Sequence, residues 1–167
     1  LVPGQALGPT DKWDVSHVSG YTLPYKVEVV GACPGAPKVV DCSRLSLAAC
    51  PEKENLGLRA GPQSMRVLSR DKQAVVGCVA PCAKLVNSAT HQGLDYEPEA
   101  LEALQYCCPT PPVSEAQCAG GPVALTNYVA TVHELCPDVN AYAYDAGLGL
   151  GECPAGTRYD VTFYCPA

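Results

Sequence analysis

The chain has 167 residues, of which eleven are cysteines, and its formal net charge is −6. A chain of this length buries roughly 70% of its unfolded surface, which is enough for the apolar core of one domain. Its isoelectric point near 4.9 argues against nucleic-acid partners, because binding to phosphate backbones needs clustered lysine and arginine.

The first predicted element is a segment without regular structure. Residues 1–12 contain prolines and glycines without periodicity, so we expect a linker or a processed N-terminal segment. Between residues 13 and 30, the stretches WDVSHVS and YKVEVV alternate apolar and polar residues, which predicts two half-buried strands. Residues 31–63 are rich in proline and predict loops, with one short strand at residues 38–40.

Helical patterns follow in the middle of the chain. We predict helices over residues 70–86, 97–107 and 123–135, of which the last has the clearest periodicity. Its apolar residues recur three and four positions apart, which is typical of an amphipathic helix. The residues at this spacing are Leu125, Tyr128, Val129, Val132 and Leu135.

The C-terminal part returns to extended patterns. Residues 140–145 (NAYAYD) alternate, the glycine-rich residues 146–152 predict a turn, and residues 158–164 (RYDVTFY) predict a closing strand. No apolar run is long enough for a membrane span, and no signal-like leader opens the chain. We therefore expect a mature or processed soluble protein.

The eleven cysteines are dispersed between Cys33 and Cys165, without a CxxC pair, and the three histidines are scattered. Zinc ligands usually occur as compact pairs, so this pattern favours disulfides over a metal site. Disulfides form and persist in oxidising compartments, so we expect a secreted, extracellular protein. We expect neither a metal nor a cofactor.

Two C-terminal stretches, LCPDVNAYAYD and ECPAGTRYDVTFYCP, resemble the C-terminal signature of thaumatin-like proteins, the pathogenesis-related group five family. Upstream, DVSHVSGYTLP is similar to the DVSxVDGFNLP element of that family. The spacing of Cys78 and Cys82 after Gly77, and the YCC segment followed by Cys118, are similar to its cysteine segments. The resemblance covers most of the chain from Trp13 onward.

The resemblance implies a mainly β fold. The family has a flattened antiparallel β-sandwich, which would be incomplete in this chain, and a helical, disulfide-rich second domain beside an acidic cleft. We assign residues 13–40 and 137–167 to the sandwich portion and residues 41–136 to the disulfide-rich helical and loop domain.

The resemblance also implies which cysteines pair, since ten cysteines alone leave 945 pairings open. The implied disulfides are Cys33–Cys153, Cys42–Cys136, Cys50–Cys78, Cys82–Cys107 and Cys108–Cys118. Cys165 is left over, because in the family the matching cysteine pairs with one near the N-terminus of the complete protein.

Three explanations for the unpaired Cys165 remain open. In the first, the N-terminal segment of the same precursor is a separate chain, linked through Cys165. In the second, this sequence is a part of the protein. In the third, the protein is genuinely short, and Cys165 bridges a symmetric dimer or stays a buried thiol.

The family cleft carries an arginine, a glutamate and three aspartates, and only the aspartate positions fall within this chain. Asp14 and Asp145 match two of them, whereas Ser19 replaces the third. A carboxylate that only stabilises a turn or a strand edge is an equally good interpretation of Asp14 and Asp145. Aromatic rings stack on sugars or pack in cores, and both roles are open for Tyr21, Tyr25, Tyr142 and Tyr144.

The first functional hypothesis is a secreted, defence-type protein, with antifungal character, that binds β-1,3-glucan or a cell-wall surface. The second is a weak endo-β-1,3-glucanase, which the replacement by Ser19 disfavours, so the sequence leans against an enzyme. The third is a structural component of an extracellular assembly, in which a neighbouring chain supplies missing strands.

Overall fold

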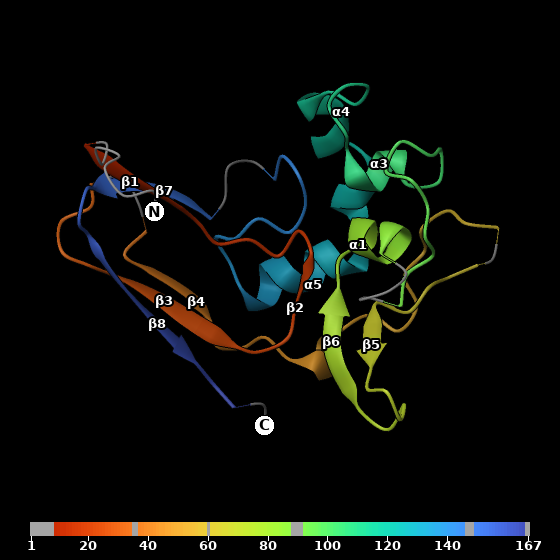
Figure 1. Ribbon diagram of the computed structural model, residues 1–167, viewed down its shortest axis with the longest axis horizontal. Helices are drawn as coiled ribbons and strands as arrows, with labels where there is room; N and C mark the ends of the chain where they lie inside the picture. Colours follow the sequence, from red (N-terminus) through yellow and green to blue (C-terminus); the bar gives the residue numbers. More distant parts are fainter. Residues whose placement is uncertain (1–8, 35–36, 60, 88–91, 146–148, 166–167) are drawn as a thin grey trace, which may run out of the picture.

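The computed structural model describes residues 9–34, 37–59, 61–87, 92–145 and 149–165. Within these residues the fold is mainly β, as predicted, with three antiparallel sheets and short helices. In Figure 1, β1, β7, β3, β4 and β8 lie on one side of the molecule, and β5, β6, α1, α3 and α4 lie on the other. None of the described helices is both long and apolar enough to cross a bilayer.

The first sheet has the order β4-β3-β8, with bounds Val39–Cys42, Tyr25–Val30 and Arg158–Phe163. In β3, Val27 lies opposite Val40 on one side and Val161 on the other, so these three side chains share a face. Val40 is 1% exposed, whereas Val161 is 51% exposed. The apolar face of this sheet is therefore buried at β4 and exposed to solvent at β8.

The second sheet pairs β1 (Thr10–Asp14) with β7 (Leu150–Pro154). Trp13 lies opposite Gly151, and a Cβ at that glycine would approach the indole ring to 2.2 Å, so the close contact requires glycine. The Cys33–Cys153 disulfide and Val29 pack nearby and join this sheet to the first.

Two expectations for this second sheet were wrong. β1 begins at Thr10, inside the segment predicted to be a linker. Of the predicted turn, residues 146–148 lie outside the described residues, while β7 takes up its C-terminal part. The glycines had predicted a turn, but Gly151 lies in β7, where the absence of a side chain makes room for the Trp13 ring.

The third sheet has the order β2-β6-β5, with bounds Gly20–Tyr21, Val75–Val79 and Arg66–Leu68. β6 lies where a helix over residues 70–86 was predicted. Its valines are β-branched and favour a strand, so only α1 (Pro81–Val86) is helical there, with proline in its first turn.

The other helices are shorter than predicted. Of residues 97–107, only α3 (Leu104–Cys107) is helical. The predicted helix over residues 123–135 is divided into the 3₁₀ turn η2 (Pro122–Leu125) and α5 (Asn127–Leu135). Thr126 separates them because its Oγ1 accepts a hydrogen bond from Val129 N at 3.3 Å and caps α5. The remaining helical segments are η1 (Leu47–Ala49) and α4 (Glu115–Ala119).

Five disulfides hold the loops, and they join the same cysteines as the family resemblance implies. In the chain-entropy model each stabilises the fold by about 3 to 5 kcal/mol. Cys165 is free and exposed, so it is not a buried thiol.

A buried carboxylate fixes the start of α5. Glu54 is 2% exposed, and its Oε2 accepts a hydrogen bond from Tyr128 N at 2.8 Å. Its Oε1 accepts two more from Asn127, from N at 3.1 Å and Nδ2 at 3.2 Å. Glu54 thereby satisfies backbone donors that begin the helix and have no partner inside it.

We predict that Glu54→Gln lowers the free energy of unfolding by about 1.5 to 3 kcal/mol, because charge-assisted hydrogen bonds are lost in the core. Guanidinium denaturation without reductant measures the change. The matched control is the exposed Glu99→Gln. Equal stability of the two variants would contradict the role of Glu54.

Candidate functional site

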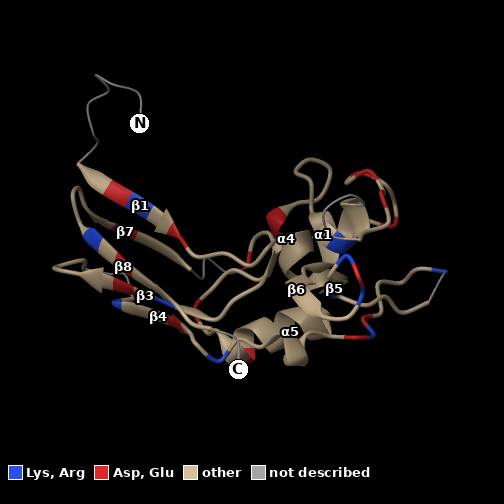
Figure 2. Ribbon diagram, turned by 60° about the horizontal axis from the view of Figure 1, so that its bottom comes forward, with Lys and Arg blue, Asp and Glu red and all other residues tan. Residues whose placement is uncertain are grey.

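A cleft of about 610 Å³ lies between the end of β1 and α4. Acidic residues lie on both of these elements (Figure 2). The residues that form its walls and floor are Asp14, Ser16, Val18, Glu115, Ala116, Ala119, Asn140, Tyr142, Ala143, Tyr144, Asp145 and Leu150. Four predicted site residues, namely Asp14, Asp145, Tyr142 and Tyr144, thus meet in one hollow.

Asp14 is the last residue of β1 and is exposed at the cleft. Asn140 Nδ2 donates a hydrogen bond to its Oδ1 at 3.0 Å. The backbone fixes this contact, since Ser16 and Asn140 form a parallel bridge and His17 N donates to Asn140 O at 2.7 Å. Asp14 is therefore both oriented and accessible to a ligand.

Asp145 lines the cleft but is 4% exposed. Its Oδ2 lies 2.8 Å from His133 Nε2 and accepts a hydrogen bond from Ala141 N at 2.7 Å. These contacts fold residues 141–145 into turns, where the alternating residues had predicted extended structure. The carboxylate of Asp145 thus shapes the cleft wall.

The two cleft tyrosines differ in exposure. Tyr142 is 8% exposed, and burial raises the pKa of its phenol, with a further contribution from the Asp145 carboxylate. Tyr144 is 39% exposed, and its hydroxyl donates to Thr110 Oγ1 at 3.0 Å. Tyr144 is the ring that is available to a ligand.

Tyr21 and Tyr25 do not line this cleft. Tyr21 is 6% exposed and stacks on Tyr128 with ring centroids 6.4 Å apart. The Tyr25 hydroxyl lies 2.9 Å from His17 Nε2. Burial raises the pKa of both phenols to about 12. Tyr21 packs in the core, whereas Tyr25 is half-buried and lines a separate hollow of about 350 Å³ with Phe163.

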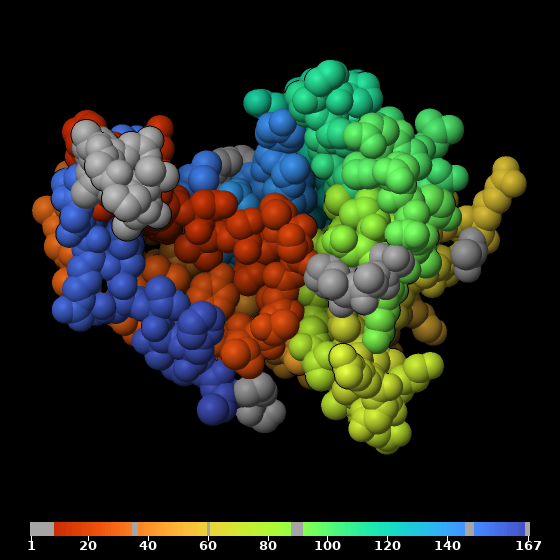
Figure 3. Space-filling model, in the orientation of Figure 1, coloured from red at the N-terminus to blue at the C-terminus, as the bar shows by residue number. Residues whose placement is uncertain are grey.

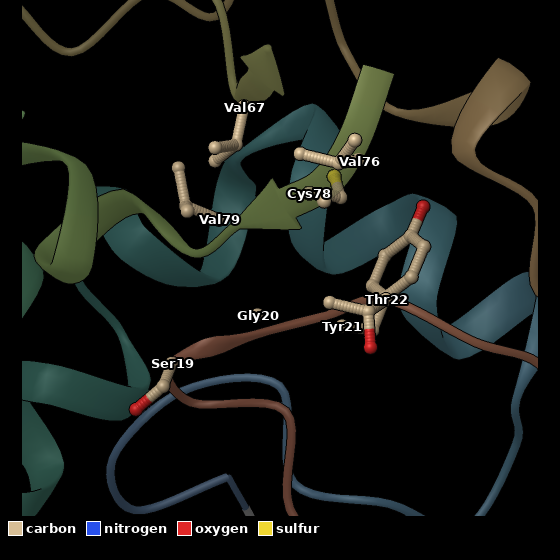
Figure 4. Close-up of a pocket in the computed structure, with 9 residues that line it drawn as sticks. Ser19, Gly20, Tyr21, Thr22, Val67, Val76, Cys78 and Val79 are labelled. Atoms are coloured by element: carbon tan, nitrogen blue, oxygen red, sulfur yellow. The ribbon is translucent and has the colours of Figure 1, made fainter. Parts of the chain in front are cut away.

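Ser19 does not line the 610 Å³ cleft. It lines a separate pocket of about 400 Å³ between β2 and the β5–β6 hairpin (Figure 4). Val67, Val76 and Val79 form its apolar side. Ser19 also lines a smaller hollow of about 230 Å³ with Tyr142 and Ala143, two residues that line the 610 Å³ cleft as well.

Sequence reasoning missed Glu115, which lines the cleft from α4. Glu115 lies inside a capping box formed by Ser114 and Gln117. Ser114 Oγ accepts a hydrogen bond from Gln117 N at 3.3 Å, and Gln117 Oε1 accepts one from Ser114 N at 2.9 Å. The motif Ser-x-x-Gln at residues 114–117 was the signal that predicts a helix here. It does not predict which surface the helix faces.

One described group brings potential metal ligands together. The ligand atoms of His17, Cys42 and Cys136 lie within 4.8 Å of one another and are buried. The two sulfur atoms are joined in a disulfide, so they are not thiolate ligands in this structure.

The Thaumatin family model matches residues 3–166. The chain belongs to the thaumatin family. Thaumatin-like protein 2 of Prunus persica is 32% identical over 160 residues, which cover 95% of this chain and 51% of that protein. A protein of Prunus avium named glucan endo-1,3-beta-glucosidase is 31% identical over 159 residues, with 95% and 51% covered. Pathogenesis-related protein 5 of Arabidopsis thaliana is 28% identical, again with 95% and 51% covered.

The chain spans about half the length of these curated relatives. Asp14 and Asp145 both lie among the described residues and both line the 610 Å³ cleft.

We predict an acid-sensitive fold because of His17. Burial lowers the pKa of His17 below 6.5, and the hydrogen bond with Gly20 O only partly offsets this effect. The unfolded chain therefore binds more protons than the folded chain below that pH, and stability falls as the pH decreases from 6.5 toward the folded pKa.

Guanidinium denaturation at about pH 7 and about pH 5 measures this loss. The decrease in the free energy of unfolding should be smaller in His17→Gln than in the wild type. An equal decrease in both proteins would show that His17 does not cause it.

Proposed function

We propose that this chain is a secreted, defence-type thaumatin-like protein that binds β-1,3-glucan or a related cell-wall polysaccharide through the cleft. The observation that carries the proposal is the meeting of the exposed Tyr144 ring with the Asp14 carboxylate in one hollow. Sugar rings stack on aromatic faces, and sugar hydroxyls donate hydrogen bonds to carboxylates. A cleft of about 610 Å³ also falls within the range of small-ligand sites.

Family membership and disulfide content support the biological setting. A relative of this chain is named pathogenesis-related protein 5, which favours a role in defence. Five disulfides favour an oxidising compartment, and hence secretion. Antifungal activity would follow from binding to a fungal wall glucan.

Endo-β-1,3-glucanase activity is the second candidate, because one relative carries that name. Glycoside hydrolysis needs a carboxylic acid and a carboxylate on either side of the scissile bond. Asp145 is buried and bound by its neighbours, so a catalytic pair would have to consist of the exposed Asp14 and Glu115. Binding needs only the exposed Tyr144 ring and the oriented Asp14 carboxylate, so it is the proposal that the geometry supports better.

We predict that Tyr144→Ala weakens binding of laminarihexaose about 3- to 10-fold, because the stacking surface is lost. Tyr144→Phe keeps the ring and should bind like the wild type. Isothermal titration calorimetry measures both, with Tyr164→Ala as a control for a tyrosine outside the cleft.

Binding by the wild type and no effect of Tyr144→Ala would place the glucan elsewhere. Release of reducing ends from laminarin by the wild type would establish the glucanase instead of the pure binding protein.

We also propose that the N-terminal segment of the same precursor, as a separate chain, covers the open face of β8 and bonds to Cys165. Val161 and Phe163 on this face are 51% and 65% exposed, and they line a hollow of about 350 Å³ with Tyr25 and Val27. Figure 3 shows the C-terminal part of the chain (blue) beside the N-terminal part (red and orange) on this surface. Exposed apolar surface beside an edge strand favours pairing with a further strand.

Intact mass of the protein as isolated from its source, with and without reductant, tests this partner. We predict that reduction releases a second polypeptide that contains cysteine. A mass that rises only by the hydrogens taken up by five intrachain disulfides, or a disulfide-linked dimer of this chain, would contradict the proposal.

A further inference from the structure

Of the three carboxylates that line the cleft, Asp145 is already engaged. Its buried oxygen binds His133 and the backbone of Ala141, so a ligand would have to displace internal contacts to reach it. Asp14 and Glu115 are both exposed, and they come from different elements, β1 and α4. A ligand in the cleft therefore meets two available carboxylates.

Glu115 is held in place by its surroundings. The capping box at Ser114 and Gln117 fixes the first turn of α4, and the Cys108–Cys118 disulfide anchors the same helix to the core. Cys118 Sγ lies 3.0 Å from Ala143 O, in the segment that also carries Tyr144. The position of Glu115 relative to the Tyr144 ring is thus set by packed, covalently linked groups.

The carboxylate of Glu115 forms no hydrogen bond or ion pair with the residues that the structure describes. The described lining of the cleft also contains no lysine or arginine. A hydroxyl-rich, uncharged ligand would donate hydrogen bonds to these free oxygens, whereas a polyuronate would be repelled by both carboxylates.

We propose that Glu115 is a specificity-determining residue of the carbohydrate site, which accepts hydrogen bonds from sugar hydroxyls together with Asp14 and excludes anionic polysaccharides. This inference rests on the proposed glucan-binding function and adds to it a residue and a ligand class. Neutral chains bind because they bring donors without negative charge. Galacturonate chains are rejected because they bring like charge.

The test uses the full chain and two probes, laminarihexaose and a hexamer of galacturonic acid. Glu115→Gln should weaken binding of laminarihexaose about 5- to 20-fold, because charged acceptors form the stronger hydrogen bonds. It should also reduce the preference for the neutral probe over the anionic one at low ionic strength. Glu99→Gln, an exposed glutamate that does not line the cleft, should behave like the wild type in both titrations.

Ser114→Ala separates a structural effect from a direct contact. This variant removes the cap of α4 and keeps the Glu115 carboxylate. If Ser114→Ala and Glu115→Gln lower the thermal midpoint equally, but only Glu115→Gln changes the neutral-to-anionic preference, the carboxylate acts on the ligand. Equal changes in that preference would mean that Glu115 only supports the helix, and the inference would fall.

The failures of the two proposals are distinguishable. A wild type that binds no neutral glucan removes the proposed function. A wild type that binds, and loses affinity on Tyr144→Ala but not on Glu115→Gln, keeps the function and overturns the role of Glu115.

Discussion

The buried carboxylate of Asp145 is the contact on which the cleft depends. It draws the side chain of His133 and the backbone of Ala141 to one oxygen, and so turns the chain back after α5. That turn presents Tyr144 to the cleft and brings Asn140 beside Asp14. Hydrogen bonds to a charged acceptor are worth about 1.5 to 3 kcal/mol each, which is enough to define a loop that has no regular structure.

Disulfides support this turn from both ends. Cys136, at the end of α5, is bonded to Cys42 in β4, and Cys118 lies against Ala143. The first link fixes α5 to the β4-β3-β8 sheet, and the second fixes α4 to the turn. Reduction would therefore remove the cleft together with the stability of the fold.

The sequence predicted much of this site because the motifs that carry the resemblance also carry its acids. Asp14 and Asp145 lie in those motifs, and both line the cleft. The alternating pattern failed for residues 140–145, since a side-chain hydrogen bond at Asp145 outweighs the strand preference of the tyrosines. Tyr21 lies in a stretch that was open to either surface or core packing, because the sequence pattern does not say which face of a strand is buried. In the structure its ring is buried. Glu115 was missed because only tertiary packing brings α4 to the cleft.

The helix predictions failed for local reasons. Residues 70–86 were predicted to be helical, but β-branched valines make a strand of the stretch before Pro81. The long pattern over residues 123–135 holds for α5, whose buried residues are Tyr128, Val129 and Val132. The helix begins only at Asn127, because Thr126 and Glu54 accept hydrogen bonds from the backbone of its first turn. Such a cap from a distant part of the chain is invisible to periodicity.

Tyrosine-selective NMR tests most directly whether a glucan binds in the cleft beside Tyr144. Carbon-13 labelling of the nine tyrosines allows each ring to be followed during titration with laminarihexaose. We predict that the Tyr144 ring signals shift with saturation, while those of the buried Tyr21 and Tyr128 stay unchanged. Shifts at Tyr25 or Tyr164 without a shift at Tyr144 would contradict the account and place the ligand on another surface.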